Sequence, residues 1–135
     1  MIDYQSKIYT FVATSVKAAH PDTKVTSEYL RSRSETRCVT CEELENTDVQ
    51  NLNDSSRQEG YARLKYRIQA YSSAQKGKKA EARAIFATAD KAIKQLGFIR
   101  KTYATTPDLY ESTGYEIIAT YEAIISADGV IYGQE

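Results

Sequence analysis

The chain has 135 residues, of which 41% are hydrophobic and 27% charged, so we expect one folded domain and not a disordered chain. Eighteen basic residues balance eighteen acidic ones, which argues against a nucleic-acid coat protein or a polybasic membrane anchor. The apolar runs are too short to cross a bilayer, residues 1–7 do not resemble a secretory signal, and two cysteines do not make a disulfide scaffold. We therefore expect an intracellular protein.

The first predicted element is a helix over residues 3–19, because apolar side chains recur there at helical spacing. These side chains are Ile8, Phe11, Val12, Val16 and Ala19. The helix ends at His20, since a residue before a proline is pushed out of helical geometry. Alternating side chains then predict a strand over residues 23–31 and a short strand around residues 37–42.

Residues 43–59 are rich in acidic side chains and show no sustained period. Long segments without regular structure inside a compact domain are usually functional or disordered. We predict a long, mobile acidic loop over this range, because its three apolar side chains cannot offset a backbone entropy cost of roughly 1–2 kcal/mol per residue.

The second half of the chain shows the clearest periodicities. Residues 61–71 predict a strand with apolar even positions and a basic row, formed by Arg63, Lys65 and Arg67, on its other face. A helix over 79–96 follows and ends at Gly97. Further strands are predicted over 98–105, over 115–126, where Ile118 and Ile124 lie on the face opposite the other apolar residues, and over 130–132 after the Asp128–Gly129 turn.

These elements predict a single domain over residues 1–135 of the α+β class. Two helices would pack on one face of a mostly antiparallel mixed β-sheet, in the order α-β-β-β-α-β-β with a short return strand at the end. The chain has eleven tyrosines, three phenylalanines and no tryptophan, which favours a β-rich fold with tyrosines at sheet edges, or at interfaces as the alternative.

The motifs that carry chemistry in other proteins are weak in this chain. Cys38 and Cys41 match C-x-x-C, but on a strand their side chains point to opposite faces, so we expect plain thiols; a metal site completed by another subunit and a redox pair are the alternatives. His20 suits a helix end, and Gly77 suits a turn better than a phosphate cradle. No carboxylate lies in an apolar run that would raise its pKa. We predict no catalytic, cofactor-binding or metal-binding residues and no enzymatic activity.

Charge is strongly segregated along the chain. Residues 42–59 carry six acidic side chains and one basic, residues 60–107 eleven basic and two acidic, and residues 108–135 six acidic and no basic. These segments either face each other and water within one molecule, or they give the subunit unlike surfaces that meet identical neighbours. Head-to-tail contacts of the second kind close into rings or grow into filaments.

The element order and length resemble the tail terminator proteins of long-tailed bacteriophages. The strand over 61–71, the helix over 79–96 ending in Leu-Gly-Phe-Ile-Arg, and the final Val-Ile-Tyr look like the C-terminal half of that family. The acidic stretch over residues 42–46 before the strand is similar as well.

This resemblance implies a structural virion protein in the tail or neck, made in the host cytoplasm. It implies a homo-oligomeric ring, typically a hexamer, that ends tail-tube polymerisation and has the tail tube protein and a head-side connector or stopper protein as partners. It implies no cofactor, no membrane and no sequence-specific nucleic-acid binding. The predicted interface residues are Glu42, Glu43, Glu45, Arg63, Lys65, Arg67, Ile118 and Ile124.

Two other classes of function remain. Another phage neck or head-completion protein would share the ring but not the fold. A small nucleic-acid-binding module would use the basic row with Tyr61 and Tyr71 on a sheet face. That face has no recognisable RNP-type motif.

Overall fold

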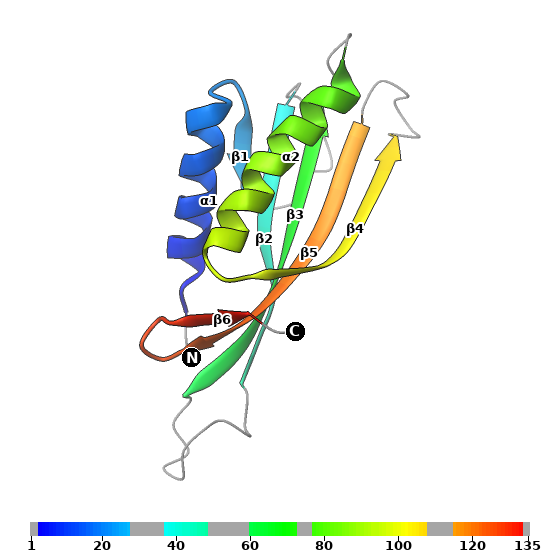
Figure 1. The fold of residues 1–135 in the computed structure, drawn as a ribbon. Coiled ribbons are helices and arrows are strands. Elements are labelled where there is room, and N and C mark those ends of the chain that lie inside the picture. Colours follow the sequence, from blue (N-terminus) through cyan, green and yellow to red (C-terminus); the bar gives the residue numbers. More distant parts are fainter. Residues whose placement is uncertain (1–2, 28–36, 49–59, 73–76, 108–114, 134–135) are drawn as a thin grey trace.

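The computed structural model describes residues 3–27, 37–48, 60–72, 77–107 and 115–133. Over these residues, two helices cover one face of a six-stranded mixed sheet (Figure 1). The strand order is β1-β2-β3-β5-β4, and β6 pairs with β5 outside this path. The predicted α+β class and the predicted order of elements are confirmed.

The element bounds are close to the predicted ones wherever a period runs without interruption. The helices are α1 (Gln5–Ala19) and α2 (Lys78–Gln95). The strands are β1 (Lys24–Thr26), β2 (Arg37–Asp48), β3 (Tyr61–Ser72), β4 (Ile99–Pro107), β5 (Tyr115–Ser126) and β6 (Ile131–Gly133). Gly97 follows α2 with a φ of 107°, and Gly129 lies in the β5–β6 turn with a φ of 88°, both as the sequence predicts.

The predicted loop over residues 43–59 is wrong in its first part, because β2 continues to Asp48. Residues 43 and 45–48 pair with β3, and the register shifts at Leu44, where a bulge sets an extra residue against Lys65. The bulge hides the strand from a search for strict alternation, while opposite charges at Glu45 and Lys65 favour the pairing. Residues 49–59 lie outside the described residues.

The predicted strand over residues 23–31 is described only as β1, three residues that pair parallel to β2; residues 28–36 lie outside the described part of the chain. The other strand pairs are antiparallel. Both β3 and β4 run antiparallel to β5, which lies between them, so the connection through α2 joins two parallel strands across an inserted third one.

The core lies between the helices and the sheet. Its helical contribution includes Ile8, Val12 and Val16 of α1 and Ala82, Ile85, Ala89 and Ile93 of α2, all at most 2% exposed. The even residues of β3 from Ala62 to Ala70 and the odd residues of β5 from Ile117 to Ile125 complete it. Each fully buried aliphatic side chain contributes roughly 1.5–3 kcal/mol, so this layer supplies most of the stability.

Two tyrosines lie at the centre of this core, Tyr66 on β3 and Tyr121 opposite it on β5. Both are 0% exposed, which differs from the sheet edges that the composition favours. The Tyr121 hydroxyl donates to Asp90 Oδ1 of α2 at 2.6 Å, and the Tyr66 hydroxyl donates to Glu43 Oε1 of β2 at 3.4 Å. These bonds satisfy polar groups that would otherwise be costly to bury.

We expect Tyr121→Phe to destabilise the protein by about 1.5–3 kcal/mol, because it removes a hydrogen bond to a charged acceptor from inside the fold. Urea unfolding followed by circular dichroism measures the change. Tyr103→Phe is the matched control: this tyrosine is 47% exposed, and the change should lie within about 0.5 kcal/mol of zero. Equal stability of Tyr121→Phe and the wild type would show that the bond does not hold α2 on the sheet.

Candidate functional site

All but one of the predicted interface residues lie on the face of β2, β3 and β5 that is turned away from the helices, here called the open sheet face. The register places Arg63, Lys65 and Arg67 of β3 between β2 and β5 on this face, because the even residues of β3 enter the core. Glu42 and Glu45 flank them from β2, and Ile118 and Ile124 belong to the same face on β5. The exception is Glu43.

The basic row does not form a free basic stripe. Arg67 Nη2 lies 2.9 Å from Glu42 Oε1, and Lys65 stands in register between Glu45 and Glu122. Farther along the same face, Gln69 Nε2 donates to Glu116 Oε1 at 2.6 Å. Acidic rows on both sides weaken the field that a phosphate backbone needs, so this arrangement disfavours nucleic-acid binding on the open sheet face.

Ile118 and Ile124 lie half-buried on the open sheet face, in register with Gln69 and Arg63 respectively. The prediction that they stand opposite the other apolar residues of β5 is confirmed by this register. Their part in an interface stays a prediction.

Glu43 lies on the face of the sheet that the helices cover, in register with Tyr66. Its carboxylate accepts a hydrogen bond from the Tyr66 hydroxyl. Burial raises the pKa of Glu43, the negative charge of Asp3 raises it further, and the bond from Tyr66 opposes both effects. No apolar run surrounds Glu43 in the sequence, as stated for all carboxylates, yet the fold raises its pKa. The neighbours responsible lie far from Glu43 in the chain, so no local pattern could show them.

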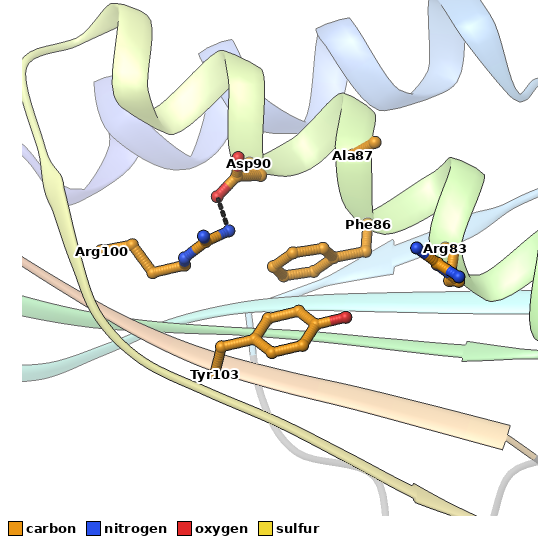
Figure 2. A pocket seen from close by; sticks show the side chains of 6 residues that line it. All are labelled: Arg83, Phe86, Ala87, Asp90, Arg100 and Tyr103. Carbon is orange, nitrogen blue, oxygen red and sulfur yellow. Dashed lines mark hydrogen bonds and ion pairs between the residues drawn. The ribbon is translucent and has the colours of Figure 1, made fainter.

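A groove that the sequence did not indicate lies between α2 and β4 (Figure 2). It has a volume of about 320 Å³ and is lined by Arg83, Phe86, Ala87, Asp90, Arg100 and Tyr103. The rings of Phe86 and Tyr103 meet edge to face, with centroids 5.5 Å apart. Arg100 lies 5.3 Å from the centre of the Tyr103 ring and donates to Asp90 Oδ1 at 3.4 Å.

The groove depends on an irregularity in β4. The register shifts between Arg100 and Thr102, so Arg100 pairs with Tyr121 and Tyr103 with Ala119, both on the helix side of the sheet. Residues three apart on a regular strand would lie on opposite faces. On α2, the spacing of Arg83, Phe86 and Ala87 is the helical signal that places them together.

The two cysteines lie on opposite faces, as predicted: Cys38 is in register with Tyr71 and Cys41 with Ile68. Both cysteines are buried, and neither is in a disulfide bond. Burial raises the pKa of Cys41 to about 12. Among the described residues no group of three or more His, Cys, Asp or Glu side chains is placed to hold a metal ion. His20 caps the end of α1, and its Nε2 lies 3.1 Å from Thr88 Oγ1 of α2.

No model of a known protein family matches this chain, and a search of curated proteins finds no similar sequence. Within the described part of the chain, neither helix is long and apolar enough to cross a membrane.

The Cys41 thiol should make stability fall at alkaline pH. Its pKa in the folded state is about 12 against an ordinary value of 9.0, so between these values the folded state keeps a proton that the unfolded state releases. The contribution of the Cys41 thiol to the free energy of unfolding is fully present below pH 9 and decreases as the pH rises toward 12. We expect Cys41→Ala to reduce this slope by up to about 1.4 kcal/mol per pH unit. Urea unfolding at several pH values measures it, and an unchanged slope would contradict the assignment.

Glu43→Gln should stabilise the protein at pH 7 and lose this advantage in acid. The raised pKa means that the folded state favours the protonated carboxyl, so ionisation above the ordinary pKa of Glu costs stability. Glutamine is neutral at every pH and keeps an oxygen for the Tyr66 hydroxyl. Thermal unfolding at pH 4 and pH 7 tests this, with Glu122→Gln on the open sheet face as the control. A lower melting temperature at pH 7 would refute it.

Proposed function

We propose that this chain is a structural virion protein, the tail terminator of a long-tailed bacteriophage. It assembles into a closed homo-oligomeric ring that ends polymerisation of the tail tube and joins the tail to the head-side connector. The observed α+β fold and element order agree with the fold implied by the resemblance stated above. The observation that carries the proposal is the unlike charge of the two edges of the sheet, one near β2 and the other at β4.

The edge of the sheet near β2 is acidic. From Glu42 to Asp48, β2 carries four acidic residues and no basic one, and of these Glu45 is exposed. The opposite edge is basic: β4 exposes Arg100 and Lys101, and α2, which packs over β3 and β5, exposes Lys79, Arg83, Lys91 and Lys94. Because β2 and β4 lie on opposite sides of β3 and β5 in the strand order, one copy can meet the next head to tail.

The open sheet face serves a different partner in this proposal. Contacts between copies use the two edges of the sheet. Ile118 and Ile124, on the open sheet face, are then available to the tail tube protein or the connector. A buried isoleucine contributes roughly 1.5–3 kcal/mol, and an exposed ion pair at most about 1 kcal/mol. Apolar contact therefore supplies most of the affinity there, and charge selects the register.

The nucleic-acid alternative has a direct test. A filter-binding assay over a range of salt concentrations would show affinity that falls steeply with salt if the basic residues bind phosphates. The acidic neighbours of Lys65 and Arg67 lead us to expect no such binding on the open sheet face. Another phage neck protein would also form a ring. Binding to purified tail tube protein distinguishes the two hypotheses, because only a tail terminator should bind the tube.

We expect phage particles made without this protein to have tails of irregular, often excessive length that are not joined to heads. A tube without its terminator keeps a free end identical to the one just occupied, so subunits continue to add. Electron microscopy of lysates from a phage with this gene disrupted measures tail length and joining, with the gene supplied in trans as the control. Joined tails of normal length would refute the proposal.

A further inference from the structure

The bulge on β2 presents an apolar side chain among carboxylates. Leu44 is 36% exposed, and Glu43 and Glu45 stand on either side of it in the chain. Of the described strands, only β1 pairs with the outer edge of β2, and only at residues 38–40. Residues 42–45, here called the acidic ridge, therefore lie at an edge of the sheet that no described strand covers.

The groove between α2 and β4 has the opposite character. Its apolar part is the Phe86–Tyr103 pair, of which Tyr103 is 47% exposed, although large aromatic side chains are usually covered. Arg83 is exposed beside this pair and forms no ion pair with any described residue (Figure 2). Phe86 is only 5% exposed, so the groove combines the exposed ring of Tyr103 with a cation that has no partner in the described chain.

We propose that the acidic ridge of one copy docks into this groove of the next copy. Leu44 packs on the exposed ring of Tyr103, and Glu45 pairs with Arg83. This inference rests on the proposed ring, for which it names the contact. A leucine beside a carboxylate matches an aromatic surface beside a guanidinium in both polarity and charge.

The occupant is a second copy. Asp90 lines the groove but is already paired with Lys94 and Arg100, so Arg83 is the groove cation that remains for an incoming carboxylate such as Glu45. The ridge places its anionic group only beside its apolar one, so Glu45 can reach Arg83 while Leu44 covers the Tyr103 ring. Because β2 and β4 lie on opposite sides of the strand order, the contact leaves the first copy its groove and the second copy its ridge for further neighbours.

Two variants separate the ridge from the groove. Leu44→Asp disables the ridge and keeps the groove, and Tyr103→Asp disables the groove and keeps the ridge. Each should raise the dissociation constant of assembly by roughly 10- to 100-fold. Val130→Asp is the matched control: this exposed valine in the β5–β6 turn, 48% exposed, lies outside both surfaces and should assemble as the wild type does.

Mixing the two variants is the decisive measurement, made by light scattering after size-exclusion chromatography. Each variant alone should remain monomeric, whereas the equimolar mixture should form dimers and nothing larger, because only one competent ridge meets one competent groove. If either variant alone assembles to the wild-type mass, or if the mixture stays monomeric, the contact is wrong. If Tyr103→Asp alone fails to assemble while Leu44→Asp alone assembles normally, the groove binds a segment other than the acidic ridge.

A charge exchange provides a second test that leaves the core untouched. Glu45→Arg and Arg83→Glu should each weaken assembly, and the double variant should restore it. Lys91→Glu, exposed on the same helix outside the groove, is the control and should have no effect. No restoration in the double variant would overturn the pairing.

The fate of the wild type distinguishes this contact from the ring itself. A wild-type ring that persists in every variant overturns only the contact. A wild type that stays monomeric up to about 1 mM, the weak end of measurable association, overturns both the ring and the contact.

Discussion

The arrangement of the sheet and helices depends on one constraint: two buried tyrosine hydroxyls must each find a hydrogen-bond acceptor. Tyr66 and Tyr121 stand side by side at the centre of the sheet, where water does not reach them. Their acceptors, Glu43 and Asp90, come from β2 and α2, so the same two bonds connect the centre of the sheet to its acidic edge and to the helix layer. Burial and these bonds raise the pKa of both hydroxyls, which therefore remain donors.

Asp90 extends this connection to the groove. Besides Tyr121, its carboxylate contacts Arg100 of β4 and Lys94 one turn along α2, at 3.4 Å and 3.1 Å. One carboxylate thus holds α2, β4 and β5 together. The charges that are segregated along the chain have two different surroundings in the fold. The basic residues of β3 lie between acidic neighbours, whereas the described basic side chains of α2 and β4 are exposed.

The sequence predicted the elements with an uninterrupted period, whereas of the two bulged strands it predicted β4 but only the first half of β2. Strand β5 was predicted with its observed bounds, and both helices and β3 to within two residues at each end. The extra residues at Leu44 and Lys101 change which positions share a face, so strict alternation could reveal neither the second half of β2 nor the groove. The tyrosine pair required the order β3-β5-β4, which no local pattern contains.

That strand order also has a consequence for how the chain folds. The two central strands are not consecutive, because α2 and β4 come between β3 and β5 in the chain. The centre of the sheet therefore closes only after β5 returns past β4, a contact of large sequence separation that makes folding slow. Until it closes, β3 exposes an unpaired edge beside the apolar residues of the future core. The chain is then most vulnerable to aggregation at the strand that later becomes the most protected.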